Sequence, residues 1–327
     1  MLKPYFFAKL CATLTLLMSL HVSAQQERWF EVEIYLFERQ SHSNEQAPEE
    51  VSLVSTRGAI DMITPEVYTD ISAASAGLSG CTAQDWLNKP DECNSQLTTT
   101  TLTHPTHVGP TVASHGLQYA TAGETSILLS EQQSQFADIV TKLSREPGNQ
   151  SLLHMTWQQS MLPRHQTKPI RLYAGKDFSD SFEANGYPVV SSSALGIPSF
   201  DFLISQFDEP KTEPVWQLDG LMNIYLDHYL FVEMQLGLRQ EGLKAANPTI
   251  DTSDATVATV ATETVATEEL APTPYLYALP MKQNRRLRSE QIHYFDHPNM
   301  GLVLQIRKMV QPDELEVVDG ERVIPQI

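Results

Sequence analysis

The sequence predicts an α+β fold, predominantly antiparallel β-sheet in two halves of the chain, with one clear amphipathic helix. Several segments alternate apolar and polar residues with a period of two, which is typical of strands that bury one face. One segment, at about 128–146, repeats its apolar residues at helical spacing instead. A Thr- and Ala-rich stretch with no such pattern indicates a disordered insertion.

The first 24 residues, MLKPYFFAKLCATLTLLMSLHVSA, have the pattern of a secretory signal peptide. Lys3 and Lys9 give a positive leader, an apolar run follows, and the segment ends in Val-Ser-Ala. The apolar run is too short to anchor the chain across a bilayer, and no later stretch reaches eighteen uninterrupted apolar residues. We therefore expect cleavage after Ala24 and a soluble periplasmic protein with no membrane span after signal cleavage.

The charge of the chain excludes two classes of partner. The formal net charge is −18, and removal of the leader with its two lysines takes it to −20. A nucleic-acid binder needs a basic face to neutralise phosphates, and a protein of anionic membranes needs the same. We therefore expect neither nucleic acid nor a membrane surface as a partner.

Two cysteines remain after the leader, Cys81 and Cys93, in the stretch SGCTAQDWLNKPDECNSQ. In an exported protein such a pair predicts a disulfide that clamps a loop. Closing a loop of this size contributes about 3 kcal/mol in the chain-entropy account. A zinc site would need further ligands nearby, and a catalytic thiol does not normally have a matched partner.

The segment 28–39 predicts the first strand. Its apolar face carries Val32, Ile34 and Leu36, and the opposite face mixes aromatic and acidic side chains. Those side chains are Trp29, Glu31, Glu33, Tyr35 and Phe37. Two further strands are expected mid-chain, in SLLHMTWQQSML with Leu153, Met155 and Trp157 on one face, and in KPIRLYAG.

The helix is expected in LLSEQQSQFADIVTKLSREPGN, residues 128–149. Ser130 is the predicted N-cap, Gln133 occupies the capping-box position, and Pro147-Gly148 ends the helix. Its apolar face consists of Phe136, Ile139, Val140 and Leu143.

The second half of the chain is more strongly β. From 222 to 238 every even position except His228 is apolar, a stripe that indicates one long bent strand or two consecutive strands. The domain organisation predicted is a signal peptide at 1–24, an N-terminal α+β domain at 25–190 with the disulfide-clamped loop, a C-terminal antiparallel β region at 212–312 with a disordered insert at 245–274, and a flexible tail at 313–327.

The stretch HYFDHPNMG, residues 293–301, is the main chemical candidate. His293 and His297 suggest a metal site, but in a strand these positions lie roughly 13 Å apart, and Pro298 rules out the helix that would align them. The residues from Asp296 to Asn299 have turn chemistry. A turn is therefore expected, with a ligand-contacting loop as the alternative, and we predict no metal and no cofactor.

The run QNRRLRS, residues 283–289, is the one dense basic segment of this acidic chain. In a strand, Arg285 and Arg286 point to opposite faces, and Arg288 lies on the side of Arg286. Such charges can protect an edge strand from aggregation. They can also bind carboxylates of an acidic ligand or partner. The predicted ligand-binding residues are Arg285, Arg286, Arg288, His293 and Tyr294.

Known hydrolase motifs, such as G-x-S-x-G, S-x-x-K and H-E-x-x-H, do not occur in the sequence. No catalytic residue is therefore predicted, and a non-enzymatic protein is expected. An enzyme remains the competing class, for example a wall hydrolase with an unrecognised pair of carboxylates.

Four segments, taken in order, resemble the CsiV family of periplasmic peptidoglycan-binding proteins. They are RWFEVEIYLFER, HMTWQQSMLPRHQTKPIRLYAGK, WQLDGLMNIYLDHYLFVEMQLGLR and RRLRSEQIHYFDHPNMGLVLQI. The resemblance implies a non-enzymatic factor of cell-wall biogenesis and cell shape. It implies as partners peptidoglycan, a peptidoglycan synthase (a penicillin-binding protein) and the outer-membrane lipoprotein activator of that synthase. The alternative is a scaffold that binds these proteins and never the glycan.

Overall fold

The computed structural model describes residues 28–40, 51, 54–71, 81–93, 102–121, 123–189, 213–244, 272–312, 316–318 and 321–323. The expected leader at 1–24 and residues 245–271 of the expected insertion lie outside these ranges. Thr273 and Pro274, which the sequence assigned to the insertion, belong to a strand.

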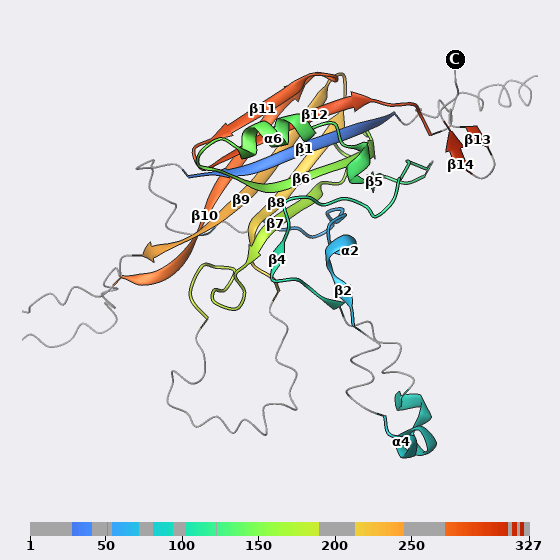
Figure 1. The fold of residues 1–327 in the computed structure, drawn as a ribbon, viewed down its shortest axis with the longest axis vertical. Helices are drawn as coiled ribbons and strands as arrows, with labels where there is room; N and C mark the ends of the chain where they lie inside the picture. The colour runs from blue at the N-terminus through green and yellow to red at the C-terminus, as the bar shows by residue number, and fades with distance from the viewer. Residues whose placement is uncertain are drawn as a thin grey trace, which may run out of the picture.

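Two five-stranded antiparallel sheets face each other (Figure 1). Sheet A has the order β11-β12-β1-β6-β5, and sheet B the order β10-β9-β8-β7-β4. The strands of sheet A are β1 (Trp29–Arg39), β5 (Ser126–Leu128), β6 (Asn149–Ser160), β11 (Ile292–His297) and β12 (Met300–Lys308). Those of sheet B are β4 (His107–Val108), β7 (Ile170–Asp177), β8 (Trp216–Leu226), β9 (Leu230–Lys244) and β10 (Thr273–Leu287).

Neither sheet is confined to one half of the sequence. In sheet A the first strand, β1, lies between β6 and β12, so Ile34 pairs with Met155 on one side and with Leu304 on the other. In sheet B, β7 of the first half pairs with β8 of the second. The mostly antiparallel β-architecture is confirmed, and its two sheets are interleaved along the chain.

The core lies between the sheets and uses the alternating positions that the sequence indicated. Val32, Ile34 and Leu36 are fully buried, and they belong to the same cluster as the apolar faces of the other strands. The even-numbered stripe lies on β8 and β9, which form a hairpin because Leu226 pairs with Leu230. His228, the one polar member of the stripe, falls in the exposed turn between them.

The expected helix is shorter than predicted. Residues 131–133 form a 3₁₀ turn, η1 (Glu131–Gln133), and the α-helix proper is α6 (Ala137–Ser144). The Ser130–Gln133 capping box exists, but it caps η1. The predicted apolar face is confirmed: Phe136, Ile139, Val140 and Leu143 pack on Tyr35, Phe37 and Val303. Figure 1 shows α6 lying across sheet A, over β1 and β12.

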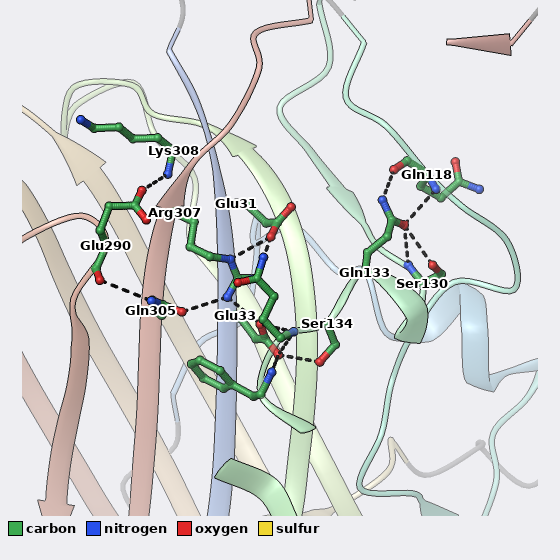
Figure 2. A network of polar contacts seen from close by, with 12 residues as sticks. Glu31, Glu33, Gln118, Ser130, Gln133, Ser134, Glu290, Gln305, Arg307 and Lys308 are labelled. Atoms are coloured by element: carbon green, nitrogen blue, oxygen red, sulfur yellow. Dashed lines mark hydrogen bonds and ion pairs between the residues drawn. The ribbon is translucent and has the colours of Figure 1, made fainter. Parts of the chain in front are cut away.

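The helical segment is interrupted between η1 and α6 because Glu33 binds the backbone there. The Glu33 carboxylate is fully buried and accepts hydrogen bonds from the Ser134 hydroxyl at 2.6 Å and from the backbone N–H of Phe136 at 2.8 Å. His154 Nε2 lies 2.9 Å from Glu33 Oε1, and Arg307 Nη1 lies 2.7 Å from Oε2. Figure 2 shows the contacts of Glu33 with Arg307 of β12 and with Ser134 in the chain that leads into α6.

The network decides the ionisation of Glu33. Burial alone raises the pKa of its carboxyl group. The hydrogen bonds from His154, Ser134 and the backbone of Gln135, together with the charge of Arg307, outweigh burial and lower the pKa to about 2. Glu33 is therefore a charged group in the interior, stabilised by partners from three parts of the chain.

The remaining elements are short: α2 (Thr64–Val67), β2 (Thr69–Asp70), α4 (Ala83–Asn88), β3 (Leu102–Thr103), β13 (Glu316–Val318) and β14 (Glu321–Val323). The Cys81–Cys93 disulfide is confirmed and spans α4, which lies outside the two sheets (Figure 1). The tail, expected to be flexible, contains the hairpin β13–β14. Among the described residues, no helix is both long and apolar enough to cross a membrane.

We predict that Glu33→Gln lowers the free energy of unfolding by about 3 kcal/mol, because it leaves the buried Arg307 without one of its counterions. Glu31→Gln is the matched control, since Glu31 binds the same arginine with a partly exposed side chain and should cost less. Urea unfolding measures both. Equal losses in the two variants would contradict a central role for Glu33.

The same carboxyl group predicts a pH dependence. Its pKa is lowered in the folded protein, so its contribution is complete above its ordinary value of 4.5 and is lost as the pH falls towards about 2. Unfolding measured between these pH values should show a steeper loss of stability in the wild type than in Glu33→Gln.

Candidate binding surface

The five predicted ligand-binding residues lie where the edges of the two sheets meet. β10 is an edge strand of sheet B and β11 an edge strand of sheet A, with a turn between them. Arg285 and Arg286 are on β10, His293 and Tyr294 are on β11, and Arg288 is in the turn. The edge position expected for the basic run is confirmed.

Arg285 and Tyr294 belong to a polar cluster at this corner. Arg285 Nη1 donates a hydrogen bond to the carbonyl oxygen of Tyr294 at 3.1 Å, and its guanidinium lies over the ring of Phe295. The Tyr294 hydroxyl donates to Asp296 at 2.9 Å and also contacts Arg39. Burial, reinforced by the bond to Asp296, raises the pKa of Tyr294 to about 12. The hydroxyl therefore stays protonated and can donate.

The other predicted residues have different surroundings. The Arg286 guanidinium lies on the opposite face of β10, 3.6 Å from the ring centroid of Tyr229, which is in the β8–β9 turn. His293 Nε2 lies 3.0 Å from the carbonyl oxygen of Arg288 and so closes the β10–β11 turn. The five residues are thus divided between a corner, a turn and an outer face, and they do not line one groove.

The stretch 293–301 is a strand followed by a tight turn, as its Pro and Asn predicted. His297 pairs with Met300, which leaves Pro298 and Asn299 as the turn between β11 and β12. Within the described ranges, no group of three His, Cys, Asp or Glu side chains is arranged to hold a metal ion. Gly301 follows because its partner across the sheet, Phe37, fills the space that a Cβ would need.

Sequence reasoning missed a groove on the outer face of sheet B. This hollow of about 540 Å³ is open to solvent and extends over β8, β9 and β10, and its apolar lining consists of Pro169, Leu221 and Met234. Its polar lining consists of Arg164, Asn223, Glu233, Gln235, Lys282, Gln283 and Asn284. Apart from Met234, the lining residues of β8 and β9 are at odd positions. Their even-numbered neighbours form the core, so the same two strands build both the core and the groove.

Glu233 is the organising residue of this groove. Arg164 contacts both of its carboxylate oxygens, at 3.0 and 3.1 Å. The Tyr225 hydroxyl and the Asn284 side-chain N–H donate to Oε1 at 3.0 and 3.2 Å. The pKa of Arg164 is raised by its hydrogen bond and ion pair with Glu233. The carboxylate is thus neutralised in place, which leaves the amides and Lys282 to meet a ligand.

Arg286 continues the same surface. On a strand, residues two apart share a face, so Lys282, Asn284 and Arg286 follow one another along the outer side of β10. Arg286 and the half-exposed ring of Tyr229 form the end of the row. Arg286 and Tyr229 lie beyond the residues that line the groove, on the same face of sheet B. The residues that line the groove come from segments distant in sequence, and no local pattern marks them as a group.

The sequence model of the family described as "Peptidoglycan-binding protein, CsiV" matches residues 9–309, nearly the whole chain. The chain belongs to the CsiV family. The resemblance stated from four segments is confirmed, and membership suggests peptidoglycan as a partner. Neither a curated protein nor a solved structure gives a significant match.

The buried cluster of Ser134, His154 and Glu33 has the residue types of a hydrolytic triad but not its geometry. In a triad, the serine and the acid contact different nitrogens of the imidazole. Here Ser134 and Glu33 both approach Nε2, at 3.2 and 2.9 Å, and the serine hydroxyl donates to the carboxylate. The arrangement suits a buried polar network and offers no route for proton relay.

We predict that Asp296→Asn lowers the pKa of Tyr294 from about 12 towards the ordinary value of 10.0, because the acceptor loses its charge. NMR titration of ring-labelled tyrosine measures the change. Asp180→Asn, at an exposed position near the end of β7, is the control and should leave the Tyr294 titration unchanged. An unchanged Tyr294 in Asp296→Asn would mean that burial alone sets its pKa.

Proposed function

We propose that this CsiV-family protein is a non-enzymatic, periplasmic peptidoglycan-binding factor that assists a cell-wall synthase and its outer-membrane lipoprotein activator. Family membership supports peptidoglycan as the ligand. The observation that carries the proposal is the open groove on sheet B with its several polar side chains, beyond which Arg286 and Tyr229 lie on the same face.

The chemistry of the groove suits a glycan strand that carries peptides. Sugar hydroxyl and acetamido groups both donate and accept hydrogen bonds, as do the side-chain amides of Asn223, Gln235 and Asn284. Lys282 is an exposed cation that can meet the carboxylates of the peptides. An exposed aromatic ring such as Tyr229 can pack on a sugar face. The shallow, open shape fits a long polymer better than a small molecule.

The five residues predicted from the sequence keep a place in this proposal. Arg286 is the direct glycan contact among them. Arg285 and Tyr294 present a second surface at the corner of the sheets, and His293 with Arg288 holds the turn that positions it. Exposed Ile292 and Tyr294 on the edge strand β11 favour a protein partner there. A scaffold that binds synthase or activator without glycan is therefore the second candidate.

We predict that the double variant Lys282→Ala, Asn284→Ala weakens binding to purified sacculi about tenfold, because it removes one cation and one amide from the groove. Pull-down with increasing amounts of sacculi measures it. Lys142→Ala, on α6 over the other sheet, is the control for general charge effects. Wild-type protein that stays wholly in the supernatant would overturn peptidoglycan binding altogether.

Alanine substitution of Arg285 and of Arg286 is expected to have different effects on binding. Arg286→Ala should weaken sacculus binding by about five- to tenfold, whereas Arg285→Ala should leave it unchanged, since the two side chains leave β10 on opposite faces. If Arg285→Ala instead reduces co-purification with the synthase or its activator, the corner is the partner surface. If neither changes any binding, the arginines serve only to protect an edge strand.

Two further assays separate the alternatives. Isolated glycan strands without any partner protein distinguish direct binding from a scaffold, because a pure scaffold leaves them free. Zymography on wall material distinguishes a hydrolase, since clearing of the gel requires turnover and binding does not.

A further inference from the structure

A second hollow lies next to the groove on the outer face of sheet B. It has a volume of about 430 Å³ and is lined by side chains of β7, β8, β9 and β10 together with residues before β2 and β8. Its charged members are Arg171, Asp219, Arg239 and Glu213. The volume is within the usual range for a pocket that encloses a small molecule or one end of a larger one.

The two hollows are neighbours on the same strands. Asp219 pairs with Gly237 in the second hollow, and the next outward-facing pair, Leu221 with Gln235, lines the groove. Two residues of a strand span about 7 Å. One extended ligand can therefore occupy the groove and send a branch into the second hollow.

Of the two arginines in the second hollow, Arg171 has a carboxylate partner and Arg239 has none in direct contact among the described residues. Arg171 donates to both oxygens of Asp219, from Nε at 3.2 Å and from Nη2 at 3.1 Å, so this pair satisfies itself. Arg239 is not part of any ion pair among the described residues. It donates one hydrogen bond, from Nη1 to the carbonyl oxygen of Trp216 at 2.6 Å, and its Nε is buried with no acceptor.

Arg239 therefore feels the charges of Asp219 and Asp177 but has no ion pair with a carboxylate among the described residues, and its Nε has no acceptor. Burial lowers the pKa of Arg239, which reflects the cost of keeping its charge there. The free acid of the hollow, Glu213, is an exposed residue at the end of the segment that leads into β8. A carboxylate is the planar anion that matches the guanidinium fork.

We propose that Arg239 receives a carboxylate of the peptide that branches from the glycan strand, while the strand itself lies in the adjoining groove. The proposal rests on the peptidoglycan binding proposed above and assigns its ligand as the peptide-bearing wall polymer. Glu213 is placed to meet an amino group of the same peptide.

Three probes test this with the purified protein: peptide-bearing disaccharide fragments, peptide-free glycan strands, and the same fragments with their carboxylates converted to carboxamides. The wild type should bind the first at least about tenfold more tightly than either of the others. Arg239→Met should remove this preference and leave binding to peptide-free strands unchanged. Arg145→Met, at an exposed position after α6, is the control.

If Arg239 had only a structural role, Arg239→Met would lower the stability and leave the preference for carboxylate fragments intact. Under the proposal, removal of this partly buried cation, which has no ion pair with a carboxylate among the described residues, should leave stability unchanged or raise it. Loss of stability with an intact preference would overturn the proposal. If Arg239→Met does not fold, the affinities of the wild type for carboxylate and carboxamide fragments are compared instead. Equal affinity for the two would contradict the proposal. Binding to peptide-free strands without any preference overturns this inference alone. Binding to none of the probes overturns the proposed function as well.

Discussion

The buried carboxylate of Glu33 is the constraint on which the arrangement of the molecule depends. Taking such a charge out of water is costly unless several partners meet it, and its partners come from β6, β12 and the residues before α6. The first strand of the fold is therefore joined to both its neighbours and to the helix by one side chain. The hydrogen bonds of Glu33 also hold α6 over the outer face of sheet A. The groove therefore lies on the outer face of sheet B, which α6 does not cover.

The local structure could be predicted from the sequence, but the pairing of the strands could not. Alternation placed Val32 and Leu36 in the core because a strand's period is a property of neighbouring residues. That β1 pairs with β12, more than two hundred residues later, depends on long-range packing that no local pattern records. The helix began later than predicted for the same reason. The Ser130–Gln133 signal was real, but Glu33, distant in sequence, takes the backbone N–H groups of Gln135 and Phe136.

The candidate site shows a similar division. A cluster of arginines can be recognised from the sequence alone. In the fold, however, Arg285 and Arg286 lie on opposite faces of β10 and in different surroundings. Asn223, Glu233 and Asn284 are brought together only by the register of three strands. Each of the two hollows also contains a polar atom with no hydrogen-bond partner among the described residues. These atoms are Asn223 Oδ1 in the groove and Arg239 Nε in the second hollow. Such costs are common where binding, rather than stability, determines the residue.

The long hairpin of β9 and β10 has a consequence for how the chain tolerates change. Its pairing runs without a register shift from Leu230 with Leu287 at one end to Lys244 with Thr273 at the other. The paired residues of the two strands therefore fix the register of the hairpin by themselves. Because this register is set within β9 and β10, we expect an affinity tag or fluorophore inserted between Lys244 and Thr273 to leave the groove intact.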